Sequence, residues 1–145
     1  MNLKKKVFNS LLIIIIAFVV YRTFMISMFF MGSSREDNKD PAKKDSMIEC
    51  TLKWGRLAKF PDSKREFDIY TEGSSFTRSF RCNFYLPKSD LDKWIEESSG
   101  LKDAEIQTIA PSKEKYIIKP GEGANYAEAV IDFQKCYVEI YVSWS

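Results

Sequence analysis

The sequence contains no histidine, and only three of its 145 residues are cysteines. Histidine is the commonest general base and the commonest metal ligand in proteins, so its absence removes the usual basis for both kinds of site. The cysteines, Cys50, Cys82 and Cys136, are too few and too widely spaced for a zinc cluster. We therefore expect neither a metal nor another cofactor, and no enzymatic activity.

Other catalytic or ligand-binding motifs are scarce as well. The element Gly121-Glu122-Gly123 lacks the further glycines and the following helix that a phosphate-binding loop needs. Asp92 and Glu96 stand four residues apart, a spacing that on an exposed helix face is typical of solvated carboxylates. The net charge of +2 is too small to attract nucleic acid. We accordingly expect no nucleic-acid partner and no small-molecule substrate.

The sequence does contain a long apolar run, residues 7–31, which directly follows Lys4, Lys5 and Lys6. A helix of this length rises about 37 Å, enough to cross a hydrocarbon core about 30 Å thick. The alternative is a cleaved secretory signal with a cut before Arg35, but the apolar regions of ordinary signals are shorter. The run therefore favours an uncleaved signal anchor that crosses the membrane once.

The orientation of this span follows from the basic residues beside it, which stay preferentially on the cytoplasmic side. The lysines before the span are compact, whereas the basic residues after it are mixed with acids. We expect residues 1–6 in the cytoplasm and the C-terminal part outside the inner membrane of a bacterial cell. Arg22 would fall in the outer half of the span. There it either snorkels to the interface or contacts an acidic residue of a partner helix or a lipid headgroup.

Residues 32–46 lack large apolar side chains and predict a polar linker before a single domain, residues 47–145. Within that domain, Ser89 is a suitable N-cap for a short amphipathic helix with Leu91 and Trp94 on one face, ending before Gly100. Alternating apolar and polar residues indicate strands. We thus predict an α+β fold, an antiparallel sheet with one packed helix. The predicted strands are residues 47–54, 67–70, 77–86, 104–110, 115–119, 126–133 and 136–144.

Two of the cysteines fall on the apolar sides of predicted strands. Cys82 alternates with Phe80 and Phe84, and Cys50 alternates with Leu52 in the same way. In an oxidising compartment Cys50 and Cys82 could therefore form a disulfide. The alternative is that both are buried thiols that act as small hydrophobic side chains.

Basic and aromatic residues interleave between residues 53 and 81, and tyrosines alternate with other residues near the C-terminus. Such a mixture favours a binding surface, because tyrosines and arginines are good contact residues when exposed. The alternative is ordinary alternation on a sheet, with aromatic side chains inward and basic ones outward. The candidate partner-binding residues are Arg78, Arg81, Asn83, Tyr85, Tyr137 and Tyr141.

These expectations combine into a single-pass membrane protein of the cell envelope whose outer domain binds another macromolecule, most simply a protein. One alternative is an immunity-type inhibitor that neutralises a toxin at the membrane. Another is an envelope hydrolase that uses carboxylates.

Overall fold

The computed structural model describes residues 15–16, 18–22, 40–73 and 77–144. The chain forms two compact units, Met1–Gly32 and Ser33–Ser145. In the first unit the described residues are helical, and the guanidinium carbon of Arg22 lies 5.7 Å from the centre of the Phe18 ring. Among the residues described, no helix is both long and apolar enough to cross a membrane.

Most of the predicted anchor, residues 7–31, lies outside the described residues, as do Lys4, Lys5 and Lys6. The membrane span therefore stays a prediction from the sequence.

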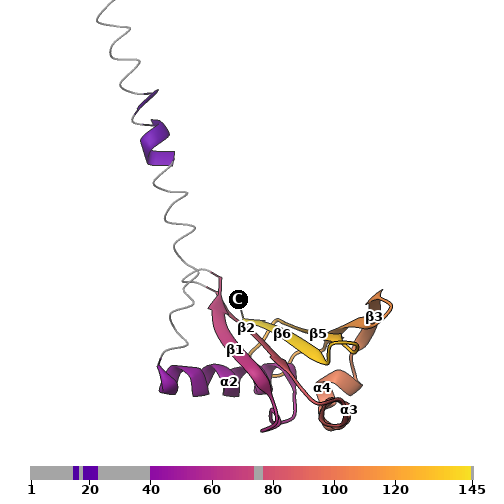
Figure 1. Ribbon diagram of the computed structural model, residues 1–145. Helices are drawn as coiled ribbons and strands as arrows, with labels where there is room; N and C mark the ends of the chain where they lie inside the picture. The colour runs from indigo at the N-terminus through magenta and orange to yellow at the C-terminus, as the bar shows by residue number, and fades with distance from the viewer. Residues whose placement is uncertain (1–14, 17, 23–39, 74–76, 145) are drawn as a thin grey trace, which may run out of the picture. The chain divides into compact units, whose positions relative to one another are not determined.

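The second unit contains a six-stranded sheet in which every neighbouring pair of strands is antiparallel. The order across the sheet is β1-β2-β6-β5-β4-β3 (Figure 1). Helices accompany the sheet, so the predicted α+β class is confirmed. The strands are β1 (Arg65–Glu72), β2 (Arg78–Tyr85), β3 (Glu105–Ala110), β4 (Lys113–Ile118), β5 (Tyr126–Asp132) and β6 (Tyr137–Trp144).

The labelled helices α2, α3 and α4 all lie on the same side of this sheet (Figure 1). Most sheet residues whose side chains face the helices are deeply buried, as expected from the two-residue period of a strand. Ile69, Cys82, Phe84, Ile131 and Ile140 are all fully buried there. The helices are α2 (Pro41–Gly55), α3 (Lys88–Glu97) and α4 (Ser99–Lys102).

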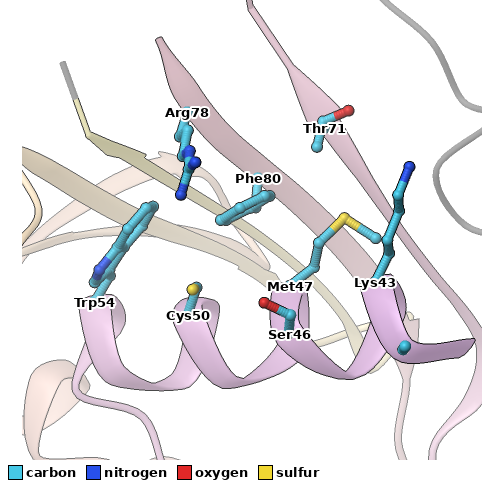
Figure 2. A pocket seen from close by; sticks show the side chains of 9 residues that line it. Lys43, Ser46, Met47, Cys50, Trp54, Thr71, Arg78 and Phe80 are labelled. Atoms are coloured by element: carbon cyan, nitrogen blue, oxygen red, sulfur yellow. The ribbon is translucent and has the colours of Figure 1, made fainter.

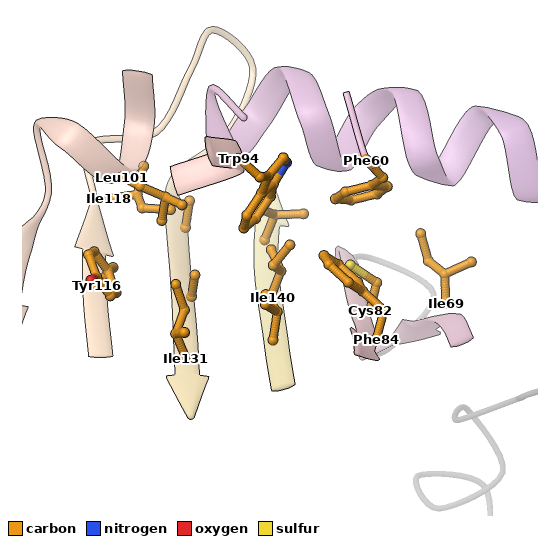
Figure 3. Close-up of a cluster of buried hydrophobic side chains, with 14 of the residues drawn as sticks. Phe60, Ile69, Cys82, Phe84, Trp94, Leu101, Tyr116, Ile118, Ile131 and Ile140 are labelled. Carbon is orange, nitrogen blue, oxygen red and sulfur yellow. The ribbon is translucent and has the colours of Figure 1, made fainter. Parts of the chain in front are cut away.

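An aromatic cluster fills the core between α3 and the sheet (Figure 3). Phe84 meets the Trp94 ring edge-on at 5.7 Å and the Phe60 ring at 5.1 Å. The indole nitrogen of Trp94 donates a hydrogen bond to the Ala58 carbonyl at 3.1 Å, which satisfies its one polar group. The segment after α2 is thereby tied to α3.

The predicted strand at residues 47–54 is wrong, because this segment belongs to helix α2. The buried stripe of α2 is Met47, Thr51 and Gly55, one residue per turn, and only the first is a large apolar side chain. The helical period was therefore weak in the sequence. Apolar residues at alternate positions, such as Leu52 and Trp54, imitated a strand instead.

Helix α2 also begins earlier than the predicted domain. Asp40 is its N-cap, accepting a hydrogen bond from the Ala42 amide at 3.1 Å, and Pro41 occupies the first turn. Residues 41–46 are thus helical rather than part of a polar linker. A single packed helix was predicted, which corresponds to α3, and the prediction missed both α2 and the short helix α4.

The predicted cap of α3 is wrong in detail. Pro87 holds the N-cap position, and Ser89, one residue inside the helix, makes no capping hydrogen bond. Gly100 lies within the short helix α4 rather than stopping α3 as a loop residue. The buried face of α3, Leu91 and Trp94, is as predicted.

The C-terminal end of α2 is held by two glycines from distant segments. The Gly100 amide donates to the Arg56 carbonyl at 2.9 Å, and the Gly121 amide donates to the Trp54 carbonyl at 2.7 Å. A Cβ atom on Gly100 would lie 2.0 Å from the Gly55 carbonyl oxygen, so only glycine permits this approach. These bonds satisfy carbonyls that a helix end leaves without partners.

Candidate binding surface

The face of the sheet that points away from α2, α3 and α4 is the candidate binding surface, and we call it the open face. Strand register places the alternate residues of neighbouring strands together on it: Arg81 pairs with Tyr141, Tyr85 with Tyr137, and Glu128 with Tyr141. Its central residues are Tyr70, Glu72, Arg81, Asn83, Tyr85, Lys115, Tyr126, Glu128, Tyr137, Glu139 and Tyr141.

Arg81 lies at the centre of a charge network on the open face. Its Nε donates to Glu72 at 3.0 Å, its Nη1 donates to Glu139, and its guanidinium lies 5.0 Å from the centre of the Tyr141 ring. Partial burial lowers the pKa of Arg81, but the hydrogen bonds to Glu139 and Glu72 outweigh burial and raise the pKa overall. The arginine is therefore a fixed, fully charged group that links β1, β2 and β6.

A second network joins β4 to β5. The Lys115 ammonium lies 2.5 Å from the Glu128 carboxylate, to which the Tyr126 hydroxyl also donates at 2.5 Å. Burial raises the pKa of Glu128, but the hydrogen bonds from Lys115 and Tyr126 outweigh it, so the net pKa is below its usual value. Glu128 is consequently held in its ionised form.

Tyrosine rings surround these networks. Tyr85 on β2 and Tyr137 on β6 are neighbours with ring centres 5.0 Å apart and ring planes tilted by 51°, and the ring centres of Tyr126 and Tyr141 lie 6.2 Å apart. Burial and the nearby Glu139 raise the pKa of Tyr137, which keeps its hydroxyl protonated at neutral pH. Each ring offers apolar area together with a hydroxyl that can donate or accept a hydrogen bond.

Five of the six predicted contact residues meet on the open face, namely Arg81, Asn83, Tyr85, Tyr137 and Tyr141. The sixth is placed differently.

Arg78 lies on the opposite, helix-covered face, because it is an even number of residues from the buried Phe80. Arg78 is therefore not part of the open face. Tyr70 belongs to the basic and aromatic stretch between residues 53 and 81. The sequence did not single out Tyr126, although the alternation in β5, with Ala127 and Ala129 buried, places Tyr126 on the open face.

The cysteines all carry free thiols. Cys82 is completely buried in β2, and burial strongly raises the pKa of its thiol. Cys50 is half-buried on α2. The predicted alternative of buried, unreactive thiols describes Cys82, whereas Cys50 remains partly accessible.

A polar hollow of about 370 Å³ lies beside α3. Asp62, Asp90 and Glu97 line it together with two lysines, and the Ser63 hydroxyl donates to Asp90 at 2.5 Å. Asp92 instead pairs with Lys88 at 3.0 Å along the exposed side of α3. Within the part of the chain that the structure describes, no group of three or more histidine, cysteine, aspartate or glutamate side chains is placed to hold a metal ion.

Comparison of the chain with protein-family models, with curated proteins and with solved structures finds no match.

Proposed function

We propose that the chain is a membrane-anchored binding protein whose open face contacts another protein. The observation that carries this proposal is the gathering of five tyrosines around the charged centre of one sheet face, on the side away from the helices. The five are Tyr70, Tyr85, Tyr126, Tyr137 and Tyr141.

The chemistry of this surface suits protein recognition. Tyrosine loses little side-chain entropy on binding and is enriched at the centre of protein interfaces, as is arginine. The rings lie on hydrogen-bonded strands, so the surface is already ordered before a partner arrives. Glu72 and Glu139 neutralise Arg81, and Lys115 neutralises Glu128, which leaves the surface polar without a strong field of one sign.

The membrane part of the proposal is supported by the apolar run at residues 7–31 and by the three lysines before it. An anchor of this kind would hold the domain close to the membrane surface, where its partner would also have to be.

Site-specific photocrosslinking in intact cells tests the proposal. A photoreactive phenylalanine analogue would replace Tyr85 or Tyr141 in the full-length chain, and the matched control would replace Glu96, which is exposed on α3 on the opposite side of the sheet. We expect both open-face positions to give the same discrete adduct and the control to give none.

A second variant separates specific contact from proximity. Tyr126→Lys places a bulky cation beside Lys115 and should abolish the adduct formed from Tyr85 without unfolding the sheet, because Tyr126 is 38% exposed. Adducts of equal yield from all three positions, or an adduct that survives this substitution, would contradict binding through the open face.

A further inference from the structure

A pocket of about 550 Å³ opens between α2 and the ends of β1 and β2, on the side of the sheet opposite the open face (Figure 2). This volume lies within the usual range for small-molecule sites. Its walls are mainly apolar: Met47, Cys50 and Trp54 from α2 face Phe80 from β2. The rings of Trp54 and Phe80 stack with centres 5.4 Å apart, so this wall is rigid.

The polar groups of the pocket are biased towards positive charge. Arg78 reaches from β2 towards the space between Trp54 and Phe80, and Lys43 rises from the first turns of α2 farther along the same cavity (Figure 2). None of the described residues that line the pocket is an aspartate or a glutamate. Among the described residues, Arg78 has no acidic partner, in contrast to Arg81 two residues later with its two glutamates.

An apolar cavity with a cation at its rim is complementary to a molecule that has an alkyl chain and an anionic head. Burial of each methylene group against such walls contributes about 0.8 kcal/mol, and a guanidinium binds carboxylate in a bidentate manner. A neutral ligand would leave Arg78 without a counter-charge, and a short anion would leave the apolar walls without contacts.

We propose that this pocket binds a single-chain anionic amphiphile, such as a free fatty acid, with the carboxylate on Arg78 and the alkyl chain along Met47, Cys50, Trp54 and Phe80. The sequence predicted no small-molecule ligand, and it could not do otherwise, because α2 was not recognised as a helix. The pocket and the open face are on opposite sides of the sheet, so the two proposals stand independently.

Protection of Cys50 from alkylation tests this site directly. The full-length chain with Cys136→Ser would be held in nanodiscs of zwitterionic phosphatidylcholine, where Cys82 is shielded by its complete burial. Dodecanoate, kept below its micelle concentration, should slow the reaction of Cys50 with N-ethylmaleimide by at least about tenfold at saturation. Dodecanol, which has the same chain without the charge, should protect far less.

The Arg78→Gln variant should require about tenfold more dodecanoate for the same protection, because one charge-assisted contact is lost. The matched control is Arg65→Gln, an exposed arginine at the start of β1 that does not line the pocket, and it should behave as the parent chain does. Trp54 fluorescence, isolated by subtracting the spectrum of Trp54→Phe, provides a second readout of the same binding.

Three results would overturn the proposal. In the first, dodecanoate changes neither the alkylation of Cys50 nor the emission of Trp54. In the second, dodecanol protects as well as dodecanoate, which indicates simple partition into an apolar surface. In the third, Arg78→Gln and Arg65→Gln bind equally well.

Discussion

At the scale of single residues, the open face is organised by charges that are neutralised within the sheet. Arg81 shares its guanidinium between Glu72 on β1 and Glu139 on β6, and Lys115 on β4 meets Glu128 on β5. Each pair joins neighbouring strands, so a substitution at one residue alters both the stability of the sheet and the charge of the surface. The contribution of an acidic partner to stability can be tested through its dependence on pH.

Glu128 should make stability depend on pH in the acid range. Its pKa in the folded chain is lower than the value of about 4.3 in an unfolded one, so its contribution is fully present above about pH 4.3. The contribution is lost as the pH falls through the lower, folded-state pKa. Glu128→Gln should reduce the free energy of unfolding at pH 7 by about 0.5–1 kcal/mol, a small effect because the pair is partly solvated.

Urea denaturation of the full-length chain in detergent, at pH 7 and at pH 3, measures this difference. The control is Glu122→Gln, an exposed glutamate in the loop before β5. A difference between Glu128→Gln and the parent chain that stays constant down to pH 3 would show that the ion pair does not supply it.

At the scale of elements, the position of α2 depends on close backbone contacts rather than on a broad apolar stripe. Its C-terminal carbonyls are taken up by the Gly100 and Gly121 amides, from two segments distant in sequence. A Cβ atom on Gly121 would lie 2.3 Å from the Lys53 carbonyl oxygen. Close backbone contacts with Gly100 and Gly121 therefore fix the C-terminal end of α2.

Gly100→Ala should separate α2 from α4. The added methyl group would overlap the Gly55 carbonyl, which belongs to the backbone and cannot turn aside, so we expect a loss of about 2–3 kcal/mol in the free energy of unfolding. Chemical denaturation followed by circular dichroism measures it. Lys102→Ala, an exposed position in α4, is the matched control and should change stability by less than about 0.5 kcal/mol. Equal stability of the two variants would show that the close approach is not rigid.

The sequence predicted secondary structure well where the apolar residues followed one clear period. The alternation in β2 and β6 leaves Phe84 and Val138 buried and Tyr85 and Tyr137 on the other face, and the strands lie where that alternation indicated. Helix α2 was missed because its buried stripe includes Thr51 and Gly55, whose small side chains pack well but add little hydrophobic signal.

The candidate sites were only partly predictable for a related reason. Membership of the open face follows from alternation along each strand, so Arg81 and Tyr141 could be placed there from the sequence alone. The pocket could not be anticipated, because it requires a helix to face a strand at a set distance. Gly100 and Gly121 likewise reveal their role only when the segments that they contact are known.

At the scale of the whole molecule, the predicted membrane span is the property that most affects function. Reporters fused after Ser145 test it: alkaline phosphatase is active only outside the cytoplasm, and green fluorescent protein exported unfolded is not fluorescent. We expect phosphatase activity and no fluorescence, because compact basic residues before a span stay in the cytoplasm.

Replacement of Lys4, Lys5 and Lys6 by glutamate should reduce the phosphatase activity severalfold, since it removes the charges that fix the orientation. Lys102→Glu, which changes a charge far from the span in sequence, is the control and should have no effect. Fluorescence of the parent fusion without phosphatase activity would place the domain in the cytoplasm and refute the proposed location.

The order of the strands also determines when the domain can fold. Strand β6 is synthesised after every other described strand, yet it lies inside the sheet between β2 and β5. Without β6, the β1–β2 hairpin and the β3–β4–β5 meander share no strand pairing. The hydrogen bond between Arg81 and Glu139 likewise joins residues that are 58 positions apart in the sequence, so it forms only when β6 pairs with β2. On the proposed route outward, the domain would therefore stay unfolded while it is threaded through the membrane, and it would fold only after arrival.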